Sequence, residues 1–405
     1  MAETGTPAEA PSGSALLLTG AKVVTPEAVL DEGVVLVADG RIVAVLDVES
    51  DKTRLGPLAQ SIVRGAERVE LGGGYIVPGL IDLHVHGAAT YSYDDGAEAI
   101  AAAVAAHRRH GTTSTMVSLI TGAPDKMVRS IQGAVAAAAD DPRILGIHLE
   151  GPFLADSRRG AHDPTKLLAP DTALFDTFLA AGDGLLRMIT AAPELPGGMD
   201  LVRAVVSSGV HYAVGHCDAD YAQAAAAFDA GADIVTHAFN AMRPLHHRDP
   251  GVIAAARDAG AVLEAINDGV HLHDATVRLL HSIAPDKLAL ITDAMAASCA
   301  HDGHYMLGTL DVDVVDGVAR LTEGGSIAGS TLTMDRALRR AVTEVGLDIV
   351  DAVGAATRVP ARFLGLERQI GAVQPGMVAD LVLLDGAWGV RAILLAGEWG
   401  DERRP

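Results

Sequence analysis

The 405-residue chain is poor in cysteine, in aromatic side chains and in positive charge. Cys217 and Cys299 are its only cysteines, and because two thiols cannot form a disulfide framework, we expect a reducing, cytoplasmic setting. Aromatic residues make up 3%, so Ala, Val, Leu and Ile must fill the core that 49% hydrophobic residues allow. The chain has 31 Lys and Arg against 52 Asp and Glu, and this net charge of −21 argues against nucleic acid as a partner. An anionic small substrate would need a local cationic pocket.

Long apolar runs are also absent. No run approaches the ~18 residues that a membrane-spanning helix requires, so we expect no membrane partner. The first residues, MAETGTPAEAPSGS, lack the basic start and the apolar run of a signal peptide. Because this segment is rich in Ala, Pro, Gly and Ser, residues 1–14 are predicted to form a disordered tail.

Two β-rich ends flank a middle of different character. Residues 15–75 are short Val- and Leu-rich runs broken by turns, among them the Asp39-Gly40 hairpin signal, and residues 369–405 read in the same way. We predict that both ends build one small β-sandwich domain. Two unrelated β decorations are the alternative.

The middle, residues 76–368, alternates short apolar runs with Ala-rich helical segments, and Gly closes several of these helices. Eight of the runs are predicted to be strands, at 76–84, 113–120, 143–149, 186–191, 210–215, 233–236, 261–266 and 288–292. Eight such units predict an α/β fold, a closed TIM-like (β/α)8 barrel of ~250 residues. An open doubly wound sheet is the alternative, which the lack of a Gly-rich dinucleotide or phosphate loop after the early strands disfavours.

Several of the predicted strands end in a side chain that can bind a metal. His84 and His86 lie two residues apart on one strand, so both face the same way. A lone strand histidine is more often a hydrogen-bonded core residue, but two in register favour a metal. Glu150, His216 and His237 end later strands, and three such ligands with one open position are typical of catalytic zinc. The alternative for Glu150 is a salt bridge or a charge at a helix N-terminus.

Asp293 ends the last predicted strand, in the sequence ITDAM. A carboxylate at this position can accept a proton from a water molecule and give it to a leaving amine. The alternative is a helix N-cap, a position at which Asp is favoured. We rank the cap second because it does not explain why the strand ends beside the other candidate ligands.

With these residues in view, the chain resembles the amidohydrolase superfamily, and within it the N-acetylglucosamine-6-phosphate deacetylase family. The resemblance extends over about residues 15–400 and rests on PGLIDLHVHG, HLEGPF followed by RRGAHDP, GHCDAD, THAFNAM, DGVHLH, ITDAM and GMVADLVLLDG. It implies a barrel of the amidohydrolase type. It also implies hydrolysis of the acetamide of N-acetylglucosamine 6-phosphate to glucosamine 6-phosphate and acetate, in amino-sugar catabolism.

The resemblance implies roles for particular residues. Glu150, His216 and His237 are the principal metal ligands, and His84 and His86 suggest a second ion with Glu150 as the bridge. Asp293 is the catalytic acid and base, and His162 orients the acetyl carbonyl or stabilises its oxyanion. The implied substrate contacts are Ala161, Asn240, Ala241, Arg248, Asp268, His271, Ile327, Ala328 and Gly329. Because the Arg contact in the family can come from the neighbouring subunit, we expect a homodimer.

Some choices stay open at the level of sequence. One or two divalent ions are expected per subunit, with Zn²⁺ first and Fe²⁺, Mn²⁺ or Co²⁺ as alternatives, since all accept His and carboxylate ligands. The same chemistry on another substrate is one alternative, such as N-acetylgalactosamine 6-phosphate or an N-acyl amino acid. The other is a catalytically inactive barrel that acts as a scaffold, although inactive relatives usually lose ligands and the main ones are present.

Overall fold

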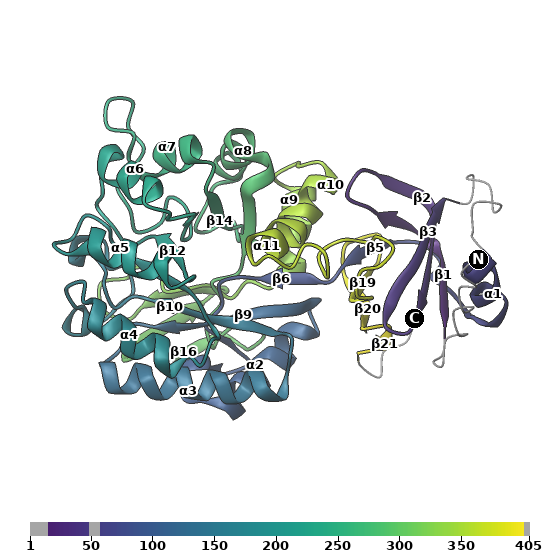
Figure 1. Ribbon diagram of the computed structural model, residues 1–405, viewed down its shortest axis with the longest axis horizontal. Helices are drawn as coiled ribbons and strands as arrows, with labels where there is room; N and C mark the ends of the chain where they lie inside the picture. Colours follow the sequence, from purple (N-terminus) through teal and green to yellow (C-terminus); the bar gives the residue numbers. More distant parts are fainter. Residues whose placement is uncertain (1–14, 48–56, 401–405) are drawn as a thin grey trace, which may run out of the picture. The chain divides into compact units, whose positions relative to one another are not determined.

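The computed structural model of the chain describes residues 15–47 and 57–400, and the predicted disordered tail, residues 1–14, lies outside them. The chain forms two compact units (Figure 1). One runs to Leu80 and resumes at Asp348, and the other spans Ile81–Leu347. The sequence analysis set the domain limits at residues 76 and 368 instead. The difference at the second limit concerns the helices α10 and α11, of which α10 contacts strand β1 of the terminal unit.

The larger unit is the predicted (β/α)8 barrel. Its sheet has the strand order β15-β14-β13-β12-β11-β10-β9-β6, which follows the chain. The strands are β6 (Leu80–Asp82), β9 (Thr112–Ile120), β10 (Ile144–Glu150), β11 (Leu186–Ala191), β12 (His211–Val214), β13 (Ile234–Val235), β14 (Val262–Ile266) and β15 (Leu288–Ile291). They agree closely with the predicted strands because each is a short apolar run, and neighbours from β9 to β15 pair in parallel.

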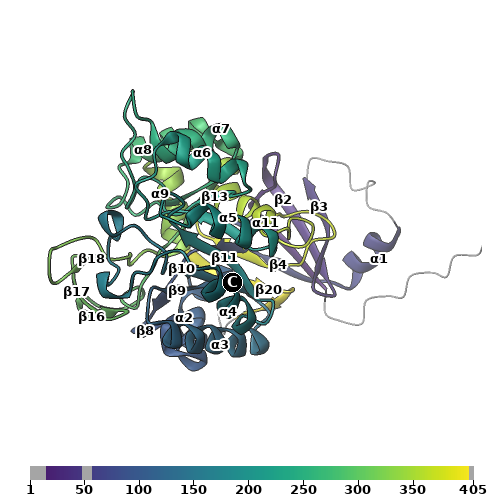
Figure 2. The same ribbon diagram turned by 60° about the vertical axis from the view of Figure 1, so that its left-hand side comes forward.

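A helix follows each barrel strand, as the alternating pattern predicts, and Figures 1 and 2 show these helices around the strands. The helices are α2 (Ala97–Arg108), α3 (Pro124–Asp140), α4 (Thr172–Ala181), α5 (Gly198–Ser207), α6 (Tyr221–Asp229), α7 (Gly251–Ala259), α8 (Asp274–Ile283) and α9 (Met334–Thr343). Local signals set their ends. Asp220 and Gln223 form a capping box at the start of α6, and Gly260 ends α7 in the left-handed conformation. In the described parts of the chain, no helix is long and apolar enough to cross a membrane.

The barrel closes between its last and first strands through backbone hydrogen bonds beyond the strand ends. The amide of Asp293 donates to the carbonyl of His84, and the amide of His86 donates to the carbonyl of Ala294, both over 2.8 Å. Buried Asp82 adds side-chain bonds, since its carboxylate accepts from the amide and the hydroxyl of Thr292. These bonds hold the segment 82–86 and the segment 292–294 side by side.

The first predicted strand, residues 76–84, is two strands in the structure. β5 (Tyr75–Pro78) pairs with strands of the terminal unit, whereas β6 pairs with β9 of the barrel. The break follows Pro78, which has no amide hydrogen to continue a ladder. The amide of the next residue, Gly79, donates to the carbonyl of Asp380.

A small sheet that the sequence analysis did not predict lies between β15 and α9, and Figure 2 shows it at the edge of the barrel unit. It consists of β16 (Gly303–Leu307), β17 (Leu310–Val315) and β18 (Val318–Leu321), paired in antiparallel fashion. Apolar residues of these strands pack with Ile120 and Met295, which places the sheet beside the ends of β9 and β15.

The terminal unit confirms that the two β-rich ends build one domain. Its strand order is β21-β20-β19-β5-β1-β2-β3, with β4 paired to β1. The elements are β1 (Leu16–Val24), β2 (Val29–Ala38), β3 (Arg41–Asp47), α1 (Pro57–Gly65), β4 (Glu67–Glu70), β5, α10 (Ile349–Ala356), α11 (Arg358–Phe363), β19 (Leu381–Leu384), β20 (Val390–Leu395) and β21 (Glu398–Trp399). One apolar cluster gathers residues from both chain ends. Asp39 and Gly40 join β2 to β3 with positive φ, as their hairpin signal predicts.

Candidate metal centre and active site

The carboxyl ends of β6, β10, β12, β13 and β15 bring the predicted ligands together around Glu150. Oε1 of Glu150 lies 3.1 Å from Nε2 of His216 and 3.1 Å from Nε2 of His237. Its other oxygen, Oε2, lies 3.2 Å from Nε2 of His86. The ligand atoms therefore form two groups that share Glu150: a first-strand group of His84, His86 and Glu150, and a later-strand group of Glu150, His216 and His237.

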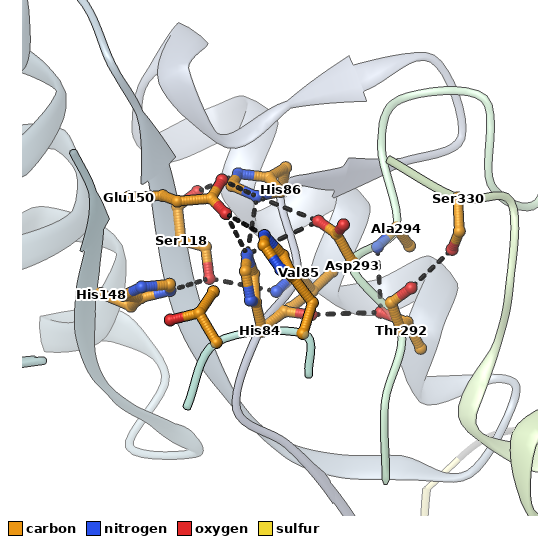
Figure 3. Close-up of polar contacts among 12 residues, drawn as sticks. His84, Val85, His86, Ser118, His148, Glu150, Thr292, Asp293, Ala294 and Ser330 are labelled. Carbon is orange, nitrogen blue, oxygen red and sulfur yellow. Dashed lines mark hydrogen bonds and ion pairs between the residues drawn. The ribbon is translucent and has the colours of Figure 1, made fainter. Parts of the chain in front are cut away.

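The first-strand group is built by extended backbone. His84 and His86 follow β6 and point to the same side, with their Nε2 atoms 3.0 Å apart (Figure 3). Nδ1 of His86 lies 3.2 Å from the carbonyl oxygen of Ser118, and Nδ1 of His84 lies 3.1 Å from Oε2 of Glu264. Both partners can only accept, so each Nδ1 donates a hydrogen and Nε2 is the nitrogen of each ring that remains to bind an ion.

The later-strand group depends on irregular backbone. His216 and His237 come directly after β12 and β13 and have φ of 46° and 28°, a left-handed region that costs a side-chain-bearing residue about 1–3 kcal/mol. The turn brings their Nε2 atoms to 2.9 Å from one another. Nδ1 of His216 donates to the carbonyl of Arg158 over 2.9 Å, while Nδ1 of His237 has no hydrogen-bond partner among the described residues. Asp293 has the same backbone geometry, with φ of 49°.

The donor set fits a divalent cation. Imidazole lone pairs that face each other at 3.0 Å repel unless a proton or a metal ion lies between them, and a carboxylate points at the same space. Electrostatics agree. Burial lowers the pKa of His84, but Glu150, Asp293 and Glu264 together raise it well above its usual range. The centre therefore attracts positive charge. Its five candidate ligands could hold one or two ions, and they are His84, His86, Glu150, His216 and His237.

The carboxylates of the centre are ionised at neutral pH. Burial raises the pKa of Glu150, but the charge of His84 and hydrogen bonds from His162, His216 and His237 hold it well below its usual range. The pKa of Asp293 is also raised by burial and is lowered more strongly by His84 and His86. Figure 3 shows Asp293 directed at these two histidines, and its Oδ1 lies 3.3 Å from Nε2 of His86.

A cavity of about 310 Å³ opens onto the centre. Six of the nine substrate contacts implied by the resemblance line it: Ala161, Asn240, Ala241, His271, Ile327 and Gly329. His162, Asp293, Ser326 and the ligands His86, Glu150, His216 and His237 line it as well. Ile120 and Leu307 add apolar walls. The structure therefore brings these implied substrate contacts to one place.

Three of the implied contacts lie elsewhere. Ala328 is buried in the apolar cluster beneath the small sheet β16–β18. Asp268 holds His271 instead of lining the cavity, since its Oδ2 lies 2.7 Å from Nδ1 of His271. Arg248 is exposed and lies against His247, away from the cavity of its own chain.

His271 supplies positive charge to the cavity. Burial lowers its pKa, but the hydrogen bond and the charge of Asp268 raise it above its usual value. Asp268 thus favours the protonated form of His271, which can donate a hydrogen bond to an anionic substrate, although the pair itself has no net charge.

His162 is held through a hydroxyl that the sequence analysis missed. Oγ1 of Thr121 lies 2.9 Å from Nδ1 of His162 and 2.9 Å from the carbonyl oxygen of Glu150. Burial and the charge of His216 lower the pKa of His162 to about 4, so its ring is neutral near pH 7. Because this hydroxyl donates its single proton to the carbonyl of Glu150, it accepts from Nδ1 of His162, which therefore carries the hydrogen of the neutral ring.

Glu264 is the second residue that the sequence analysis missed. It stands in the middle of β14, in the run VLEAI, and is fully buried. Its Oε2 accepts from Nδ1 of His84 and from the amide of His237, both over 3.1 Å. A charged residue inside an apolar strand was a signal that could have found it.

Comparisons with known proteins agree with this geometry. The family model of the amidohydrolase family matches residues 75–398. The chain is 34% identical to an N-acetylgalactosamine-6-phosphate deacetylase of Escherichia coli O157:H7 over 94% of its length and 98% of that protein. It is also 34% identical to the N-acetylglucosamine-6-phosphate deacetylase of Bos taurus over 84% of its length and 87% of that protein.

A solved structure is similar throughout. A mutant of N-acetyl-D-glucosamine-6-phosphate deacetylase from Mycobacterium smegmatis, in complex with N-acetyl-D-glucosamine-6-phosphate, superposes with a TM-score of 0.88 at 41% identity. The match covers 96% of this chain and 99% of that one. The chain thus belongs to the amidohydrolase family and, within it, to the family of the N-acetylglucosamine-6-phosphate deacetylases.

Proposed function

We propose that the protein hydrolyses the acetamide of N-acetylglucosamine 6-phosphate to glucosamine 6-phosphate and acetate. The observation that carries this proposal is the convergence of Glu150, His216 and His237 beside Asp293 in one cavity. The deacetylase relatives support the reaction and the substrate. Amino-sugar catabolism in the cytoplasm is the setting that we infer.

A divalent cation belongs to this proposal. Glu150, His216 and His237 would hold it, and His84 and His86 with Glu150 would hold a second ion. Zn²⁺ is our first choice because His and carboxylate ligands with an open position suit catalytic zinc. When bound, the ion supplies Lewis acidity at the carbonyl and makes a water molecule more acidic.

The side chains of the protein carry the protons. Asp293, an ionised carboxylate, accepts the proton of the water whose oxygen attacks the acetyl carbon. The C–N bond then breaks, and Asp293 returns this proton to the departing nitrogen, which yields the free amine and acetate. His162 lines the same cavity, held by its contact with Thr121, and would orient the acetyl carbonyl for attack.

The phosphate group needs donors at the mouth of the cavity. Protonated His271 is one, and the segment 246–248 offers two imidazoles and a guanidinium, the planar group that suits phosphate. Arg248 is exposed and does not line the cavity of its own chain, so we propose that it completes the site of a partner subunit in a homodimer.

One other substrate is supported by an observation. The relative from Escherichia coli O157:H7 is named for N-acetylgalactosamine 6-phosphate and matches 94% of the chain. The two sugars differ at a single hydroxyl group, and the lining of the cavity does not by itself select between them.

The test measures hydrolysis of four sugars by the purified, metal-loaded protein: N-acetylglucosamine and N-acetylgalactosamine, each with and without the 6-phosphate. We expect the highest kcat/KM with N-acetylglucosamine 6-phosphate. In Arg248→Ala, KM for the phosphorylated sugar should rise about 10–100-fold, as for the loss of a hydrogen bond between charged groups. Equal turnover of all four sugars would contradict the assignment, and an unchanged KM in the variant would remove Arg248 from the site.

A further inference from the structure

Glu264 is a fully buried carboxylate whose partners both belong to metal ligands. Its Oε2 accepts from Nδ1 of His84 in the first-strand group and from the amide of His237 in the later-strand group. Its Oε1 has no partner, and no Lys or Arg pairs with it, within residues 15–47 and 57–400. A buried carboxylate with so little compensation requires positive charge close by.

The contact with His84 sets that ligand apart from the other histidines. A carboxylate can only accept, so the hydrogen of His84 stays on Nδ1 and the lone pair at Nε2 faces Oε1 of Glu150 at 3.4 Å. The rings of His86 and His216 donate to neutral backbone carbonyls instead. An anionic acceptor raises the basicity of an imidazole more than a neutral one does, so His84 is the strongest donor of the set.

The contact with His237 ties the two groups together. The amide that Glu264 holds belongs to a residue in a left-handed conformation, with φ of 28°, which needs such a bond to stay in place. One oxygen atom therefore fixes His84 through its ring and His237 through its backbone. The distance to each is 3.1 Å.

We propose that Glu264 is a positioning residue of the metal centre, which fixes the ring of His84 and the backbone of His237 and so sets how tightly the centre binds a divalent cation. The inference rests on the metal-dependent function proposed above, but it concerns ion binding and not turnover. Glu264 strengthens His84 as a ligand and keeps the first-strand and later-strand groups in register across the barrel.

The experiment titrates the metal-free full-length protein with Zn²⁺ in competition with a chromophoric chelator. In Glu264→Ala the centre should bind Zn²⁺ about 10–100-fold more weakly than in the wild type, the usual effect of losing a residue that orients a metal ligand. In Glu264→Gln the loss should be smaller, because an amide oxygen still accepts one hydrogen bond but carries no charge.

Asp335→Asn provides the matched control. Asp335 pairs with His110 over 3.1 Å, the same distance as Glu264 to His84, yet neither member of that pair is a ligand. Its metal binding should equal that of the wild type.

Two results would overturn the inference: unchanged affinity for Zn²⁺ in both Glu264 variants, or the same loss in the control. If Glu264→Ala does not fold, as circular dichroism would show, Glu264→Gln decides alone. Because no sugar is present, failure of the proposed deacetylation would leave this result intact, and the reverse also holds.

Discussion

The first-strand and later-strand groups share Glu150, but the chain builds them in different ways. His84 and His86 lie two residues apart just beyond the end of β6, and their Nε2 atoms are 3.0 Å from one another. His216 and His237 belong to strands that have already ended, and each turns inward through a left-handed residue. The comparison teaches that one half of the centre follows from strand periodicity, whereas the other half depends on strain that the surrounding barrel must hold in place.

The charges around the two groups differ as well. Three carboxylates, those of Glu150, Asp293 and Glu264, lie within 3.5 Å of a ring nitrogen of His84. In the later-strand group, Glu150 is the one carboxylate that forms an ion pair with His216 or His237 among the described residues. The first-strand group is therefore the side from which Asp293 can move a proton, and the later-strand group is the more neutral side.

The largest expected effect on activity comes from removing one histidine ligand from each of the two groups in turn. His216→Ala removes one of three ligands of the catalytic ion, so activity should fall at least about 10⁴-fold. Several kcal/mol of transition-state stabilisation depend on the ion, and each 1.36 kcal/mol corresponds to about a factor of ten in rate. His86→Ala leaves the later-strand group complete and should cost less. Steady-state kinetics with metal analysis of each variant measure this, and equal losses would mean that the two groups act as one site.

The next largest effect is expected from a substitution of Asp293, the proposed proton carrier, that leaves the metal ligands unchanged. Asp293→Asn keeps the size of the side chain but cannot accept a proton, so kcat should fall about 10²–10⁴-fold. Metal content should stay at the wild-type level, measured by elemental analysis of the same preparation. Near-normal turnover would show that Asp293 is not the catalytic acid and base. Loss of metal would indicate that Asp293 is a metal ligand.

Much of this architecture could be predicted from the sequence. The eight apolar runs predicted the barrel strands because parallel strands buried on both faces are short and apolar. The residues at or just beyond the ends of these runs predicted the ligands, since the carboxyl ends of parallel strands meet at one edge of a barrel. His-x-His identified the first-strand pair in the same way.

Other features depend on tertiary context. The positive φ of His216, His237 and Asp293 has no sequence signal, since none of the three is a glycine. The strand predicted at 76–84 is divided between two sheets, because β5 finds partners in the terminal unit that no local pattern reveals. Thr121 and Glu264 act on residues that are distant in the sequence, since His162 lies 41 residues from Thr121 and His84 lies 180 residues from Glu264.

A smaller effect tests how His162 is oriented beside the shared carboxylate. Thr121→Val removes the hydroxyl between Nδ1 of His162 and the carbonyl of Glu150, so the ring loses its fixed tautomer. We expect kcat to fall about 10-fold with little change in KM, as for a residue that orients a catalytic group. Thr190→Val is the matched control, because Thr190 is equally buried and its hydroxyl contacts His148 and Thr236 instead of a cavity residue. An equal loss in both variants would indicate a general effect on packing.

The smallest expected effect concerns the thiol beside the later-strand group. Cys217 follows His216 directly and is buried, and burial raises its pKa, so it should not react with Ellman's reagent in the native protein. Cys299 is exposed and should react. One thiol per subunit should therefore be titrated in the native state and two after unfolding, while kcat stays unchanged. Rapid labelling of both thiols would show that the backbone around His216 opens readily, and the strained later-strand group would then be less firmly held than its bonds in the structure indicate.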